Sequence, residues 1–155
     1  MSIDMLKIQS SPRLYIKTRC QRRMRSRVRP PVVAPYSGIL YTMKVVENLS
    51  LAELLIMAEK MYGTLVKADV DVVKKIMIVD MDMHVDGEAY LLEHGSRQED
   101  IWGINLHPAH FGTNDFIEFD SMINIRPRQK NPSRDVLDES IRQQIRDIVS
   151  SIIHE

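Results

Sequence analysis

Charge is distributed so unevenly along this chain that only one part of it is expected to fold as a globular domain. The first 42 residues contain nine lysines and arginines and one acid, whereas residues 43–155 contain twelve basic and twenty acidic residues. The formally neutral chain thus joins a segment of charge +8 to one of charge −8, with the change beside Met43. We expect a basic leader, 1–42, followed by one domain, 43–155, whose length suits a single hydrophobic core.

The leader admits three interpretations. Six arginines lie between Arg19 and Arg29 and prolines follow, so neither a helix nor a strand is specified and disorder is expected. Clustered arginine suits a nucleic-acid-binding arm, and the composition also suits an organellar transit peptide. The third interpretation is an upstream start codon, with translation truly beginning at Met43. The absence of aromatic residues from the arginine-rich run favours this one, so nucleic acid is expected as a partner only if the leader is translated.

The remaining composition indicates a cytoplasmic protein. Cys20 is the only cysteine and lies in the leader, so neither a disulfide nor a cysteine metal site supports the domain. The longest apolar runs, such as Ile76 to Val79, are far shorter than the ~18 residues that a membrane helix requires. No membrane association is expected.

Apolar periodicity predicts the elements of the domain. Ser50 and Glu53 form a capping box at the start of a helix that ends at Gly63. Alternation over 66–72 and the run beginning at Ile76 predict a hairpin whose second strand continues through Met83. The later elements are a short helix over 88–93, strands over 102–106 and 117–125, and a C-terminal helix from 137 to 152. The predicted fold is a two-layer α+β domain in the order αββαββα.

Three stretches of this sequence resemble a known family. They are Gly95 to Leu106, Glu118 to Pro127, and Asn131-Pro132-Ser133-Arg134. Together they are similar to a small prokaryotic family catalogued only as a domain of unknown function, over about Met43 to His154. The resemblance implies a stand-alone cytosolic domain and implies no catalytic residue.

A first candidate site follows the hairpin. Polar residues recur at every second position, which would place them on one side of an extended chain: Asp80, Asp82, His84, Asp86 and Glu88. Carboxylates with one imidazole suit a divalent metal ion that activates water. The favoured alternative is the solvated face of a half-buried strand, because any amphipathic strand shows this alternation.

A second candidate is the polar face of the predicted fourth strand, which carries Glu118, Asp120, Asn124 and Arg126. If the hairpin lies alongside, these groups would converge with His84 and could orient a ligand or raise a carboxylate pKa. The favoured alternative is a cross-strand set in which Arg126 neutralises its acidic neighbours.

The third candidate is the loop 126–134, with four positive charges in nine residues before a helix. Arginine side chains and free backbone amides at a helix start suit an anion or phosphate. A solvated connection, with Ser133 or Asp135 capping the helix, is the alternative. The two interpretations are evenly matched.

The sequence therefore predicts a binding module for an anionic small molecule, phosphate-bearing ligand or partner, held by Arg126, Arg128 and Arg134. One alternative is a metal-dependent hydrolase or nuclease that uses His84, Asp86, Glu118 and Asp120. Another is a homo-oligomeric structural module that pairs through a strand edge or the Trp102 surface. Neither a cofactor nor a catalytic residue can be named.

Overall fold

The computed structural model describes residues 43–61 and 63–155. The predictions for the basic leader and for the start at Met43 lie outside the described residues.

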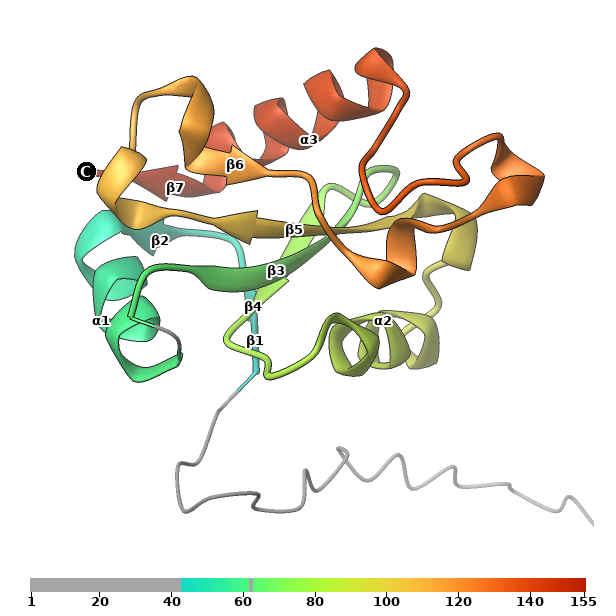
Figure 1. The fold of residues 1–155 in the computed structure, drawn as a ribbon. Helices are drawn as coiled ribbons and strands as arrows, with labels where there is room; N and C mark the ends of the chain where they lie inside the picture. The colour runs from blue at the N-terminus through green and yellow to red at the C-terminus, as the bar shows by residue number, and fades with distance from the viewer. Residues whose placement is uncertain (1–42, 62) are drawn as a thin grey trace, which may run out of the picture. The chain divides into compact units, whose positions relative to one another are not determined.

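The described part of the chain forms an α+β domain, which confirms the predicted class and the order of the main elements (Figure 1). Its helices and strands are β1 Lys44–Val46, β2 Leu49–Ser50, α1 Leu51–Met61, β3 Val66–Asp71, β4 Ile76–Val79, α2 His84–Glu93, β5 Ile101–Leu106, β6 Ile117–Glu118, α3 Glu139–Ile152 and β7 Ile153–His154. Five 3₁₀ helices complete the described part: η1 Gln98–Asp100, η2 Pro108–His110, η3 Asn114–Phe116, η4 Met122–Asn124 and η5 Pro127–Gln129. The main sheet is antiparallel in the order β1-β4-β3-β5-β6, and β2 pairs with β7 in a parallel ribbon.

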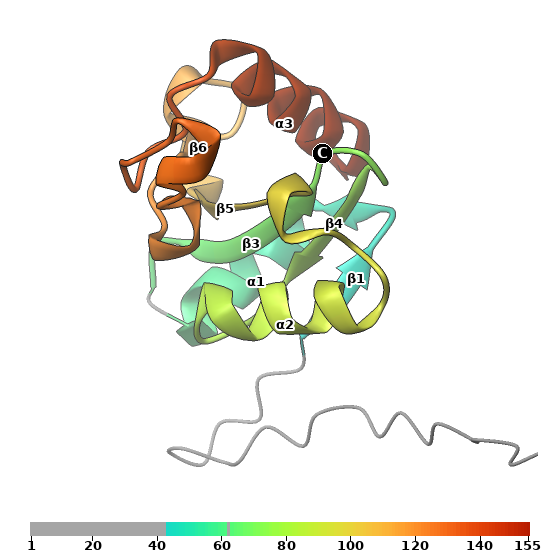
Figure 2. The same cartoon turned by 90° about the vertical axis from the view of Figure 1, so that its right-hand side faces the viewer.

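The two faces of the sheet are covered by different helices. Val66, Ala68 and Val70 of β3 are fully buried in the larger core cluster, to which α1 and α3 also contribute. Because side chains alternate along a strand, Asp69 points to the opposite face. Helix α2 lies across that face, on the other side of the sheet from α3 (Figures 1 and 2). A polar residue of β3 is thereby enclosed beneath α2.

The predicted hairpin is confirmed, but its second strand is shorter than expected. Asp71 Oδ1 accepts hydrogen bonds from the amides of Val73 and Lys74 at 2.9 and 2.8 Å and closes the turn between β3 and β4. Strand β4 ends at Val79, because Asp80 adopts a left-handed conformation with φ 66°. The chain then turns into α2, so the predicted extended polar face over 80–88 is wrong.

Both long helices begin with side-chain caps. Ser50 and Glu53 form the predicted capping box, since the Glu53 amide donates to Ser50 Oγ at 3.3 Å and the Ser50 amide donates to Glu53 Oε2 at 3.1 Å. Asp138 caps α3 by accepting from the Ser140 amide at 2.8 Å. The predicted start of this helix at Leu137 is two residues early, since Leu137 precedes α3 and is 57% exposed. None of the helices in the described residues is long and apolar enough to cross a membrane.

The predicted fourth strand over 117–125 is mostly wrong. Pairing with β5 stops after Glu118, and η4 and η5 follow. The physical reason is Asn124, whose side chain bonds both main-chain groups of Gly103 in β5, each at 2.9 Å. An amide side chain thus takes the place that a neighbouring strand would occupy. Glu118, Asp120, Asn124 and Arg126 consequently do not share one strand face.

Candidate functional site

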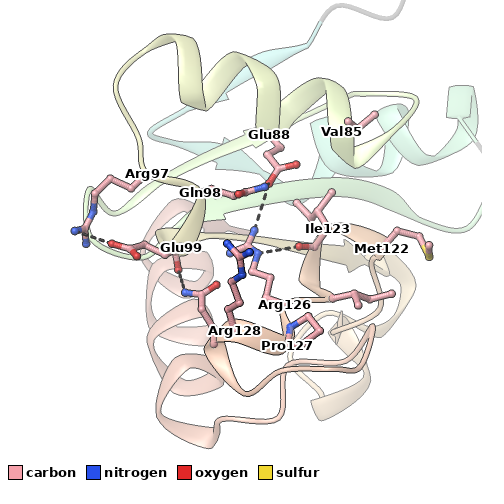
Figure 3. A pocket seen from close by; sticks show the side chains of 12 residues that line it. Val85, Glu88, Arg97, Gln98, Glu99, Met122, Ile123, Arg126, Pro127 and Arg128 are labelled. Atoms are coloured by element: carbon pink, nitrogen blue, oxygen red, sulfur yellow. Dashed lines mark hydrogen bonds and ion pairs between the residues drawn. The ribbon is translucent and has the colours of Figure 1, made fainter.

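A pocket of about 1010 Å³ opens beside α2 (Figure 3). Its walls come from the first half of α2, from η1, and from the segment that contains η4 and η5. The lining side chains are Val85, Glu88, Arg97, Gln98, Glu99, Met122, Ile123, Ile125, Arg126, Pro127, Arg128 and Gln129. Its volume is at the upper end of the range for small-molecule sites.

Arg126 is the buried cation of this pocket, with 8% of its surface exposed. Its Nε donates to the Ile123 carbonyl at 3.0 Å, and Nη2 reaches Glu88 Oε1 only at 3.4 Å. Within the described residues, no acceptor lies within hydrogen-bond distance of Nη1. The guanidinium carbon lies 5.0 Å from the Trp102 ring centroid, a cation–π distance. Burial lowers the pKa of Arg126, and the nearby carboxylate of Glu88 opposes this effect. The protein's own groups thus satisfy this guanidinium only in part.

Glu88 is the buried acid of the same pocket. Its Oε1 accepts from Gln98 Nε2 at 3.2 Å and from Arg126 at 3.4 Å. Both contacts are long for hydrogen bonds that involve a charged group. The carboxylate therefore partly offsets the charge of Arg126 without a close ion pair.

The other arginines differ in their partners. Arg128 lines the pocket, is exposed, and forms no hydrogen bond or ion pair within the described part of the chain. Arg97 also lines it, but its guanidinium binds Glu99 and Asp100, each at 2.7 Å. Arg134 lies outside the lining and pairs with Asp120 at 2.8 Å. Of the three arginines predicted to bind an anion, the structure brings Arg126 and Arg128 to one pocket and leaves Arg134 elsewhere.

A second polar cluster lies between α2 and the sheet. His84 Nδ1 is 2.7 Å from Asp69 Oδ1, and His84 Nε2 is 3.2 Å from Asn105 Oδ1. Asn105 Nδ2 donates to Glu118 Oε2 at 2.8 Å and to the Asp120 carbonyl at 3.2 Å. Both of these partners are acceptors, so the amide of Asn105 has a single chemically sensible orientation. Its oxygen must face His84, and Nε2 of His84 must therefore carry a hydrogen.

This cluster positions His84 but leaves it little freedom for chemistry. Nε2 is engaged with Asn105 and Nδ1 with Asp69, so neither nitrogen is free to act as a metal ligand or a general base. Asp69 is fully buried, and burial raises its pKa to about 6, although the hydrogen bond between Asp69 and His84 opposes the shift. The second oxygen of Asp69 has no hydrogen-bond partner within the described residues.

Gly87 explains how α2 approaches Asp69 so closely. A Cβ at position 87 would overlap Asp69 Oδ2 and Met81 Sδ. A glycine inside a helix lowers its intrinsic stability, so close packing against the sheet is the reason for its presence here.

The side chains of the other predicted site residues do not form one group. Glu118 joins the His84 cluster through Asn105, whereas Asp120 contacts Asn105 only through its main-chain carbonyl and its carboxylate pairs with Arg134. Asp86 lies in the first turn of α2, and its side chain forms no hydrogen bond or ion pair with any described residue. Asn124 is buried and bonded to main-chain groups. No three histidine, cysteine or carboxylate side chains of the described residues are grouped so that they could hold a metal ion.

Sequence reasoning missed Asp69, Asn105 and Gln98. Asp69 alternates with valine and alanine along β3, which predicted a strand but did not single out this carboxylate. The signals that could have found this cluster are Gly87, which interrupts a helix, and Asn105, which interrupts the apolar strand β5.

Comparison with known proteins gives one match. The sequence model of a family described as "Protein of unknown function (DUF5674)" matches residues 43–152. No curated protein and no solved structure shows a significant similarity to the chain.

Proposed function

The chain belongs to the DUF5674 family of proteins of unknown function, and we propose that its domain binds an anionic ligand in the pocket beside α2, through Arg126 and Arg128. The observation that carries the proposal is the buried guanidinium of Arg126, which has one long contact to a carboxylate and one nitrogen without an acceptor among the described residues. Buried charged groups are normally paired and hydrogen-bonded. An anion in this pocket would complete the pairing.

The charges of the pocket support the same conclusion. Among its lining side chains, three arginines stand against two glutamates, which leaves one net positive charge. Arg97 is already neutralised by Glu99 and Asp100, so the available charge belongs to Arg126 and Arg128. An arginine fork binds a carboxylate or phosphate through two parallel hydrogen bonds. Arg126 supplies a buried guanidinium, and Arg128 supplies an exposed one in the same pocket.

Thermal unfolding of the full-length protein with acetate or inorganic phosphate tests the proposal, with chloride at matched ionic strength as the background. A ligand at a hundredfold its dissociation constant should stabilise the native state by about 2.7 kcal/mol. We expect Arg126→Gln to abolish this stabilisation and Arg128→Gln to weaken binding severalfold.

The matched control is Arg134→Gln, which removes an equal charge outside the pocket and should leave binding unchanged. Because Arg126 is buried, its substitution risks misfolding, and the exposed Arg128 keeps the test decisive. If no anion stabilises the protein beyond chloride, or if Arg134→Gln weakens binding as much as Arg128→Gln, the proposal is wrong.

A further inference from the structure

The pocket has a polar and an apolar end. Figure 3 shows Arg97, Gln98, Arg126 and Arg128 toward one side, and Val85 and Met122 toward the other. The side chains of Met122 and Val85 at this apolar end are 65% and 50% exposed, and that of Ile125, which also lines the pocket, is 39% exposed, although each is a large hydrophobic group. Contiguous exposed apolar surface in a concave site is a common mark of ligand binding.

A small inorganic anion would leave this apolar end unexplained. Phosphate or acetate can satisfy an arginine but covers almost none of the surface of Met122, Val85 and Ile125. The pocket of about 1010 Å³ is also far larger than such an ion needs. The second half of the pocket therefore suits a different part of the same ligand.

We propose that the ligand is a small amphipathic anion, whose carboxylate or phosphate group lies at Arg126 and Arg128 and whose hydrocarbon body lies along Val85, Met122 and Ile125. This inference rests on the proposed anion-binding function and adds the chemical class of the ligand. The charged group gives orientation, because the arginines lie toward one side of the pocket and Val85 and Met122 toward the other (Figure 3). The apolar body gives affinity, since each methylene that is buried strengthens binding about fourfold.

Isothermal titration of the full-length protein with acetate, hexanoate and the neutral hexanamide tests the inference. Hexanoate carries four more methylenes than acetate. Because the apolar wall is partly open to solvent, we expect the gain to be smaller than for full burial, but at least about tenfold. Hexanamide, which has the same body without the charge, should bind at least about tenfold more weakly than hexanoate.

Met122→Ser is the informative variant, since Met122 is exposed and its substitution should not disturb folding. It should weaken hexanoate severalfold and leave acetate unchanged. Leu137→Ser is the matched control, because Leu137 is also exposed, at 57%, but does not line the pocket.

The outcomes separate this inference from the proposed function. If acetate binds in an Arg128-dependent way and hexanoate binds no more tightly, the amphipathic ligand is refuted and anion binding stands. If neither acid nor inorganic phosphate binds, both proposals fail. If hexanamide binds as tightly as hexanoate, the site is merely apolar and the assignment of the charged end is overturned.

Discussion

The buried carboxyl group of Asp69 should leave a specific mark on the pH dependence of stability. Burial beneath α2 raises its pKa from the ordinary 3.8 to about 6 in the folded protein. Between these two values the native state binds more protons than the unfolded state, so the free energy of unfolding falls as the pH rises. The contribution of Asp69 is fully present below pH 3.8 and is lost as the pH rises to about 6. A difference of about two pKa units corresponds to about 3 kcal/mol.

Urea unfolding of the full-length protein and of Asp69→Asn at a series of pH values measures this contribution. Asparagine keeps the shape of the side chain but cannot titrate. The free energy of unfolding of the native protein, minus that of the variant, should fall by up to about 3 kcal/mol between about pH 4 and 6 and stay constant above.

Asp138→Asn supplies a control of opposite sign, because the hydrogen bonds from Ser140 lower the pKa of Asp138. Its contribution to stability should be lost as the pH falls below the ordinary value, outside the Asp69 window. The difference in unfolding free energy between the unsubstituted protein and Asp69→Asn could instead stay flat between pH 4 and 6, or rise with pH. The hydrogen bond between Asp69 and His84 would then outweigh the effect of burial on the pKa of Asp69, and the prediction would be refuted.

Three further substitutions test the structure of this region. Gly87→Ala should destabilise the protein by about 1–3 kcal/mol in urea unfolding, although alanine favours helices, because the new Cβ would overlap Asp69 Oδ2. Asn124→Ala should cost about 3 kcal/mol or more in the same assay, because it leaves both main-chain groups of Gly103 without their partner. In Ser50→Ala, a carboxyl-detected NMR titration should show the pKa of Glu53 rising only part of the way to its ordinary value, since the larger cause of its lowering is the Ser50 backbone amide, which remains. If Gly87→Ala is as stable as the unsubstituted protein, α2 does not pack as closely on Asp69 as the structure shows. A mild effect of Asn124→Ala would contradict its bonds to Gly103, and an unchanged Glu53 pKa in Ser50→Ala would contradict the contribution of the Ser50 hydroxyl.

The sequence predicted those elements that depend on local pattern. The capping box of Ser50 and Glu53 and the alternation in β3 and β5 are determined by neighbours a few residues away, and the structure contains all three elements. The polar faces were predicted less well, because alternation shows which residues share a side but not what covers that side. The alternation in β3 did not show that α2 covers the face that carries Asp69, which is fully buried.

The segment after Glu118 shows a different limit. Ile117, Phe119, Ile123 and Ile125 alternate as a strand would, but Asn124 bonds the main chain of β5 and diverts the segment into 3₁₀ turns. A contact across 21 residues, from Asn124 to Gly103, has no local signal. The same diversion brings Arg126 back to Glu88 of α2, so the pocket could not be predicted without it.

The two polar clusters share α2, and this predicts that anion binding depends on pH. Arg126 lowers the pKa of Asp69 and Glu88 raises it, so both pocket groups act electrostatically on the buried carboxyl. An anion at Arg126 would offset the positive charge and raise the pKa of Asp69 further. By thermodynamic reciprocity, protonation of Asp69 must then strengthen anion binding, so affinity should weaken as the pH rises through about 6.

Titration of hexanoate between about pH 5.5 and 7.5, in buffers of different ionisation enthalpy, should show proton uptake on binding that is largest just above the pKa of Asp69, at about 6, and falls toward pH 7.5. Asp69→Asn should bind hexanoate without this proton uptake, because asparagine cannot be protonated in this pH range. Arg134→Gln should retain the uptake, because it leaves Asp69 in place. Uptake that persists in Asp69→Asn would place the linked proton elsewhere. An affinity that rises with pH would mean that the ligand's charge does not lie at Arg126, because an anion at that guanidinium offsets its charge and so raises the pKa of Asp69.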